Sequence, residues 1–240
     1  MEKIILNIPH SSTFFPDMEG FNAELISNEI NILTDWYTKQ IFDSNLVESK
    51  IADFSRIYCD IERFPDELES MFLKGMGIVY THTDSGEQLR NISETKKQEI
   101  INNYYLPYHE DLSKKVFEKL NKYDNCLIID CHSFNNIPTN RDIDQAPNRP
   151  DICIGSDSFH TPPDLVEFLA TYFTGLGYEV RVNSPYSGSL VPIHFYNKDS
   201  RVQSVMIEIN KRLYLDKNNQ PVEDNIKKLH SEIEKIYRMI

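Results

Sequence analysis

Histidine and carboxylate side chains lie where the most apolar segments of this chain end. His10 follows the apolar run at 4–8. Asp130 and His132 close the run Ile-Ile-Asp-Cys-His-Ser, and Glu208 lies inside Val-Met-Ile-Glu-Ile-Asn. Burying an ionisable side chain is costly unless the group is paired or binds a metal ion. Because the chain contains no His-Glu-x-x-His motif, the pattern suggests a zinc site assembled from distant segments.

Each of these residues also has a purely structural interpretation. A single histidine after a strand often forms only a structural hydrogen bond, and a buried carboxylate often pairs with a cation. For Glu208 that cation would be Lys211 or Arg212. Arg56, Asp60 and Arg63 surround a further apolar segment and could pair among themselves. The residue types alone therefore leave a metal site and a set of buried ion pairs as alternatives.

Several other chemistries are excluded by missing motifs. The chain has neither a Gly-x-Gly-x-x-Gly segment nor a phosphate-binding P-loop. It also lacks the Gly-x-Ser-x-Gly turn of serine hydrolases. Cys131 and His132 are neighbours on an expected strand, so their side chains point to opposite faces and do not form a nucleophile–base pair.

The elements that must position these residues alternate between strands and helices. Apolar runs predict strands, and helical spacing of apolar residues predicts amphipathic helices. Ser93 is the expected cap of a long helix that breaks near Pro107. We expect one α/β domain over residues 1–240, in which helices flank a mixed, mostly parallel sheet. The expected strands are 4–8, 51–61, 126–131, 151–155, 178–182 and 202–209, and the expected helices are 22–41, 93–123, 163–175 and 222–240.

The composition limits the partners of the protein. The 240 residues include 25 Lys and Arg against 37 Asp and Glu, for a net charge of −12, which argues against nucleic-acid binding. No apolar stretch reaches the roughly 18 residues that span a bilayer. The N-terminal segment has no signal-peptide pattern, so we expect a cytoplasmic protein. Its 4 cysteines are expected to be buried free thiols. The sequence does not specify an oligomeric state.

A series of motifs in fixed order resembles the zinc-dependent N-formylglutamate amidohydrolases. The motifs cover nearly the whole chain, and their order is more specific than any one of them. They are Ile-Pro-His-Ser-Ser (8–12), Thr-Asp-Trp (34–36), Ser-Arg-Ile-Tyr-Cys-Asp-Ile-Glu-Arg (55–63), Tyr-Leu-Pro-Tyr-His (105–109), Asp-Cys-His-Ser (130–133), Pro-Asp-Ile-Cys-Ile-Gly (150–155), Asn-Ser-Pro-Tyr-Ser-Gly (183–188), and Met-Ile-Glu-Ile-Asn followed by Leu-Tyr (206–214).

The resemblance implies a zinc carboxypeptidase-like fold, of the phosphorylase/hydrolase type, and a zinc-dependent amide hydrolysis. His10 and His132 would be zinc ligands, and Asp35, expected on a helix, would be the third ligand. Glu208 would be the general base. Three protein ligands leave the fourth zinc position for water, as catalytic zinc requires.

The resemblance also implies a small N-acyl amino acid as substrate. N-formylglutamate would be hydrolysed to formate and glutamate. Arg56 and Arg63 would bind substrate carboxylates, because the guanidinium fork matches a carboxylate. The loop of Tyr186, Ser187 and Gly188, with Ser189, would close over the acyl group.

One departure from the family pattern affects the expected substrate. Glu62 stands where the family commonly has asparagine. A carboxylate at this position would repel a substrate carboxylate if it pointed into the site. Another N-acyl amino acid or small amide is therefore an alternative substrate. A zinc peptidase, an amidase of cell-wall fragments and a non-catalytic binding protein on the same scaffold are alternative functions.

Overall fold

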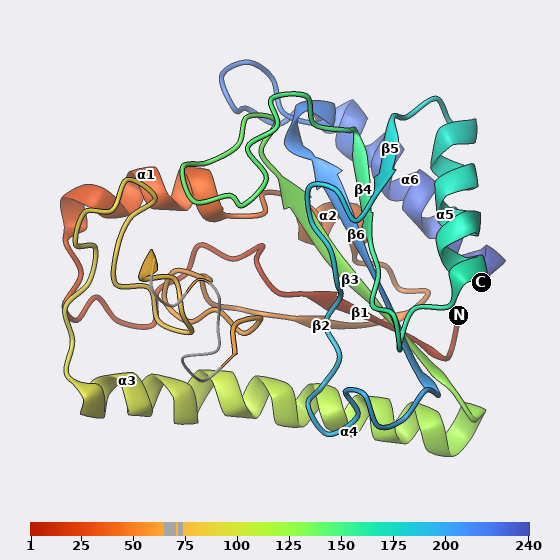
Figure 1. The fold of residues 1–240 in the computed structure, drawn as a ribbon, viewed down its shortest axis with the longest axis horizontal. Helices are drawn as coiled ribbons and strands as arrows, with labels where there is room; N and C mark the ends of the chain where they lie inside the picture. Colours follow the sequence, from red (N-terminus) through yellow and green to blue (C-terminus); the bar gives the residue numbers. More distant parts are fainter. Residues whose placement is uncertain (65–70, 72–73) are drawn as a thin grey trace.

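Six strands form one mixed sheet within the described residues of the computed structural model, which are 1–64, 71 and 74–240 (Figure 1). The strand order is β2-β1-β3-β6-β4-β5. Neighbouring strands are parallel except for the antiparallel pair of β4 and β6. The mixed, mostly parallel sheet that the sequence predicts is therefore confirmed. The strands are β1 (Ile4–Ile8), β2 (Glu48–Ile51), β3 (Cys126–Phe134), β4 (Ile152–Gly155), β5 (Val180–Val182) and β6 (Val202–Asn210).

Helices cover both faces of this sheet (Figure 1). In the described part of the chain, no helix is both long and apolar enough to cross a bilayer. The helical elements are α1 (Ala23–Leu33), α2 (Thr38–Phe42), α3 (Glu94–Ile100), a π-helical segment (Ile101–Tyr105), α4 (Leu106–Tyr123), α5 (Pro163–Gly175), a 3₁₀ turn (Lys211–Leu213) and α6 (Glu223–Met239).

The alternation of side chains along β1 shows how the two sides of the sheet are packed. Ile4, Leu6 and Ile8 belong to the core that the sheet forms with α2, α5 and α6. Ile5 points the other way and packs with Leu112 of α4. All five residues of β1 are buried. Burial on both faces thus explains why four of the five residues of the strand are apolar.

The prediction of a single helix over residues 22–41 is wrong. The segment forms α1 and α2, separated by Thr34–Tyr37, where Tyr37 has a φ of 62°. The Asp35 N–H donates to the His10 carbonyl at 3.0 Å, outside any helix. Apolar residues on both sides of the break keep helical spacing, so the spacing alone hides it. Asp35 therefore lies in a tight connection beside the end of β1, and not on a helix as expected.

The prediction of a strand over residues 51–61 is also wrong. The strand β2 ends at Ile51, and the residues that follow form successive turns. Phe54, Tyr58 and Ile61 are nevertheless buried, because they pack in a separate apolar cluster with residues of α3 and the π-helical segment. This cluster produces the apolar pattern that predicted a strand.

The long helix from Ser93 is confirmed, but the expected break at Pro107 is absent. The Ser93 side chain accepts a hydrogen bond from the Lys96 N–H, as an N-cap does. The π-helical segment links α3 directly to α4, and Pro107 lies in the first turn of α4. A change in hydrogen-bond pattern at this point accommodates a residue that has no N–H to donate.

The four cysteines are buried and free, as expected. Cys126 and Cys131 lie in β3 and Cys153 lies in β4, whereas Cys59 lies in the turns after β2.

Candidate functional site

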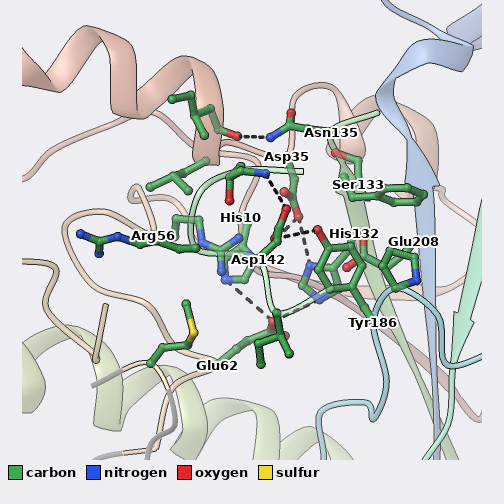
Figure 2. A pocket seen from close by; sticks show the side chains of 18 of the residues that line it. His10, Asp35, Arg56, Glu62, His132, Ser133, Asn135, Asp142, Tyr186 and Glu208 are labelled. Atoms are coloured by element: carbon green, nitrogen blue, oxygen red, sulfur yellow. Dashed lines mark hydrogen bonds and ion pairs between the residues drawn. The ribbon is translucent and has the colours of Figure 1, made fainter. Parts of the chain in front are cut away.

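A pocket of about 480 Å³ opens at the carboxyl ends of β1, β3 and β6 (Figure 2). Ligands of open α/β sheets commonly bind at this edge. His132 and Glu208 are paired in register on neighbouring parallel strands, so their side chains project from the same face of the sheet. His10 follows β1 and completes the group. The pocket lining includes the predicted residues His10, Asp35, Arg56, Arg63, His132, Tyr186, Ser187 and Glu208.

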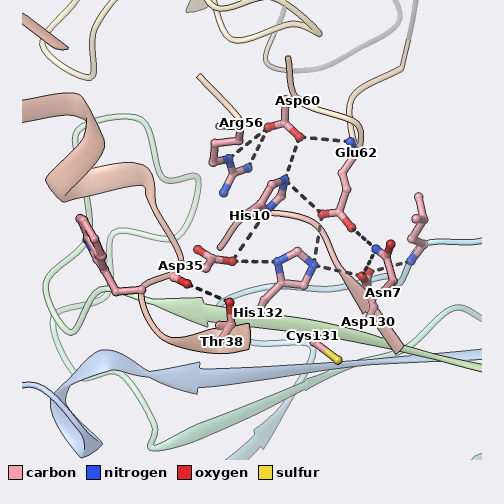
Figure 3. Close-up of polar contacts among 12 residues, drawn as sticks. Asn7, His10, Asp35, Thr38, Arg56, Asp60, Glu62, Asp130, Cys131 and His132 are labelled. Carbon is pink, nitrogen blue, oxygen red and sulfur yellow. Dashed lines mark hydrogen bonds and ion pairs between the residues drawn. The ribbon is translucent and has the colours of Figure 1, made fainter. Parts of the chain in front are cut away.

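The imidazole rings of His10 and His132 lie side by side and share one carboxylate (Figure 3). Asp35 Oδ2 is 3.0 Å from His132 Nδ1 and 3.7 Å from His10 Nδ1. The buried His10 Nδ1 atom has no hydrogen-bond partner. A single carboxylate oxygen thus faces the Nδ1 atoms of both histidines.

Other carboxylates face the opposite nitrogen atoms of the same two rings (Figure 3). His10 Nε2 hydrogen-bonds to Asp60 Oδ1 at 2.9 Å. His132 Nε2 lies 3.1 Å from Glu62 Oε2 and 3.2 Å from Asp130 Oδ1, without hydrogen-bond geometry to either. The contact of His10 Nε2 with Asp60 is of the kind that commonly orients a metal-binding histidine through its other ring nitrogen.

Glu62 offers a second set of possible metal ligands. One ligand atom each from His10, Glu62 and His132 lies within 4.8 Å of the others. Glu62 Oε2 is 3.8 Å from His10 Nε2, and Glu62 Oε1 accepts a hydrogen bond from Asn7 Nδ2 at 3.0 Å. The Glu62 carboxylate thus points into the pocket toward the histidines, so the condition under which it would repel a substrate carboxylate is met. Among the described residues, Glu62 with the two histidines is the group whose ligand atoms lie within metal-binding distance of one another, whereas the expected ligand Asp35 faces both histidines from the other side of the rings.

The concentration of carboxylates perturbs the protonation of the cluster. Burial opposes the charged form of His132, but attraction to Glu62 and Asp130 outweighs it and raises the pKa of His132 well above its usual range. Burial also opposes ionisation of Asp35, yet the hydrogen bond with His132 and the attraction to both histidines lower the pKa of this carboxyl. Such an excess of buried negative charge around two histidines suits a divalent cation.

Glu208 differs from the other carboxylates because it is not paired. Burial raises the pKa of its carboxyl to about 8, and Asp35 and Glu62 add to this shift although His132 opposes it. Its buried Oε2 atom has no hydrogen-bond partner. Lys211 instead donates to Asn135 Oδ1 at 3.0 Å, and Arg212 pairs with Asp151 at 2.9 Å. The structural pairs that the sequence left open for Glu208 are therefore not formed.

Arg56 and Arg63 reach the pocket but share Asp60. Arg56 donates to Asp60 Oδ2 through Nε at 3.2 Å and Nη2 at 2.9 Å. Arg63 Nε lies 3.5 Å from Asp60 Oδ2. The Tyr80 hydroxyl donates a hydrogen bond to the same Asp60 oxygen at 2.6 Å. Asp60 thus links both arginines to His10.

Only part of the predicted loop at 186–188 lines the pocket. Tyr186 and Ser187 line the pocket, whereas Gly188 is not among the lining residues. The Tyr186 hydroxyl donates to Asp142 Oδ1 at 3.1 Å and accepts from Arg149 Nη1 at 2.9 Å. Gly188 has a φ of 84°, which a side chain rarely allows.

The sequence reasoning missed further polar residues of the pocket wall. Asn135, Arg141 and Asp142 approach from the long polar loop after β3, and Lys211 follows β6. The sequence places Asp60 beside the arginines, and the structure adds its hydrogen bond to His10. An irregular loop carries no periodic signal that would place these side chains, whereas the position of Lys211 just after a buried strand could have singled it out.

Comparisons with known proteins agree with the fold and the motifs. The sequence model of FGase, N-formylglutamate amidohydrolase, matches residues 2–215. The crystal structure of N-formylglutamate amidohydrolase from Ralstonia eutropha JMP134 is similar with a TM-score of 0.85 and 22% identity, over 100% of this chain and 94% of that chain. A gene product of Agrobacterium tumefaciens is similar with a TM-score of 0.64 and 17% identity, over 99% of this chain and 90% of that chain. No curated protein matches the chain.

Proposed function

The chain belongs to the N-formylglutamate amidohydrolase family, whose members hydrolyse a linear amide C–N bond, and we propose that it is a zinc-dependent enzyme acting on a small N-acyl amino acid. N-formylglutamate, which would yield formate and glutamate, is the expected substrate. The observation that carries this proposal is the unpaired, buried carboxylate of Glu208 beside two histidines that share the Asp35 carboxylate.

His10, His132 and Asp35 would hold the zinc ion. In support, His10 Nδ1 is a buried nitrogen without a partner and faces Asp35, whereas His10 Nε2 already bonds to Asp60. The alternative set with Glu62 would require His10 Nε2 to leave Asp60. When bound, zinc supplies a hydroxide-like nucleophile near neutral pH by lowering the pKa of a coordinated water to about 7.

Glu208 would move the proton that amide hydrolysis requires. Its Oε2 atom accepts a proton from the attacking water and delivers it to the nitrogen of the departing amino acid. A carboxyl whose pKa lies near the working pH suits both halves of this transfer, and burial raises the pKa of Glu208 to about 8.

The remaining lining residues would bind and enclose the substrate. Arg56 and Arg63 would bind the α-carboxylate, which is next to the reacting amide, because Asp60 ties both arginines to His10. Tyr186 and Ser187 would cover the acyl group from the opposite wall. A small pocket that encloses these groups fits an amino-acid-sized substrate.

A panel of substrates tests the proposed reaction. The zinc-loaded protein is expected to release formate from N-formylglutamate with a higher kcat/KM than it cleaves N-acetyl amino acids or dipeptides. The measurement is the rate of amine release for each compound at matched concentrations. Preferential cleavage of dipeptides or of a cell-wall fragment would instead support a peptidase or amidase of that kind, and no turnover of any compound would support a binding protein.

The choice between Asp35 and Glu62 as the third ligand is testable by zinc affinity alone. We expect Asp35→Ala to weaken zinc binding by more than about 100-fold, whereas Glu62→Ala, which removes a partner of His132, should cost about 10- to 100-fold. Competition with a chromogenic chelator measures both constants. The reverse order of the two losses would assign Glu62 as the ligand.

A further inference from the structure

Arg141 places a buried guanidinium group in the wall of the pocket. Its side chain is only 7% exposed, and its Nη1 atom is buried without a hydrogen-bond partner in the described part of the chain. Leaving a buried donor of a charged group unpaired is costly. Because Arg141 lines the pocket, a ligand there can supply the missing acceptor.

Asp84 fixes the position of Arg141, but its carboxylate oxygens accept their hydrogen bonds from donors other than the guanidinium. The Asp84 carboxylate accepts hydrogen bonds from Asn140 N and Asn140 Nδ2, both at 3.0 Å, and from Arg141 N at 3.1 Å. Arg141 Nε donates to the Asp84 carbonyl at 3.3 Å. Main-chain and amide donors therefore occupy the carboxylate, while one end of the guanidinium is anchored and Nη1 stays available.

Glu29 is the carboxylate that could compete for Arg141. It is fully buried in α1, and its Oε2 atom accepts a hydrogen bond from the Asp84 N–H at 2.9 Å. Its Oε1 atom has no partner, just as Arg141 Nη1 has none, so the two groups do not pair. Burial raises the pKa of Glu29, although the charge of Arg141 opposes this shift.

The location of Arg141 separates it from the arginines that we assign to the α-carboxylate. Arg56 and Arg63 are linked to His10 through Asp60, close to the reacting amide. Arg141 is held by Asp84, which has no described hydrogen bond to the histidine cluster. A carboxylate bound by Arg141 is therefore a second carboxylate of the substrate, distinct from the one that we assign to Arg56 and Arg63.

We infer that Arg141 is a specificity-determining residue that binds the side-chain carboxylate of an acidic N-acyl amino acid. The inference rests on the proposed function and defines its substrate class as N-acyl amino acids with two carboxylates. Arg141 supplies the positive charge and N–H donors for the distal carboxylate, and the Asp84 contacts hold the guanidinium in place before the substrate arrives.

The test compares N-formylglutamate with N-formylglutamine, which keeps the α-carboxylate but has a neutral side-chain amide. Arg141→Ala is expected to lower kcat/KM for N-formylglutamate by roughly 10- to 150-fold, mainly by raising KM, because a charge-assisted hydrogen bond present throughout the reaction is lost. The same variant should leave N-formylglutamine almost unchanged. Arg201→Ala is the matched control, since it removes an exposed arginine that pairs with Asp199 outside the pocket.

The outcomes separate this inference from the proposed function. Equal losses for both compounds, or no loss for either, would overturn the role of Arg141. A parent protein that cleaves both compounds equally well would also overturn it and leave the amidohydrolase intact, whereas a parent that cleaves neither would overturn the proposed function itself. If Arg141→Ala does not fold by circular dichroism, Arg141→Lys should show a smaller loss confined to N-formylglutamate, because lysine keeps the charge but not the planar fork.

Discussion

Glu208→Gln is expected to lower kcat by about 10²- to 10⁴-fold, because glutamine keeps the shape of the side chain but cannot accept the proton of the attacking water. Zinc content and substrate KM should stay close to those of the parent protein. The thermal midpoint should also be preserved, since burial already disfavours the charged carboxylate and Oε2 has no partner to lose. Stopped assays of formate release and a thermal melt provide the two measurements.

Glu232→Gln is a suitable control for this variant. Glu232 is another buried glutamate, with 6% exposure, but it lies in α6 and accepts a hydrogen bond from the Tyr178 hydroxyl. The kcat of the Glu232→Gln variant should equal that of the parent protein. A Glu208→Gln protein with nearly normal kcat would refute the general-base assignment, and one that unfolds would favour a structural role for Glu208.

His132→Ala is expected to abolish stoichiometric zinc binding. His132 Nδ1 faces Asp35 Oδ2 at 3.0 Å, and both candidate donor sets contain this histidine. Removing a ligand should weaken binding by more than the roughly 10- to 100-fold that follows from losing a residue that only orients one. Zinc content after dialysis against a weak chelator measures the loss, and circular dichroism reports whether the fold is retained.

His230→Ala provides the comparison for His132→Ala. His230 lies on α6 and contacts the Ile41 carbonyl and Glu234, away from the pocket. The His230→Ala variant should bind as much zinc as the parent protein. A folded His132→Ala protein that keeps a full equivalent of zinc would contradict the ligand assignment.

The sequence predicts the sheet better than the connections that complete the site. Most residues of the runs at 4–8 and 126–131 are apolar, because helices cover both sides of the sheet, and these runs appear as β1 and β3. Once these strands are parallel neighbours, His10 and His132 must meet at their carboxyl ends. Position and residue type therefore placed each histidine at a strand end, whereas the strand order that brings the two together came from the structure.

The connections could not be predicted because tertiary contacts determine them. Asp35 faces both histidines only because the chain leaves its helix at Thr34, and the spacing of apolar residues continues across that break. The apolar pattern after Ile51 arises from burial against α3 and the π-helical segment, and not from sheet pairing. Arg141 is oriented by a carboxylate 57 residues away in the chain, which no local pattern reveals.

Titration of the metal-free protein with Zn²⁺, while formate release from N-formylglutamate is followed, tests the central claim most directly. Hydrolysis should be absent after chelation and should rise to a plateau at about one zinc ion per chain, as a single three-ligand site requires. Turnover that survives complete removal of the metal, or a protein that binds zinc but releases no formate at any metal concentration, would contradict the account.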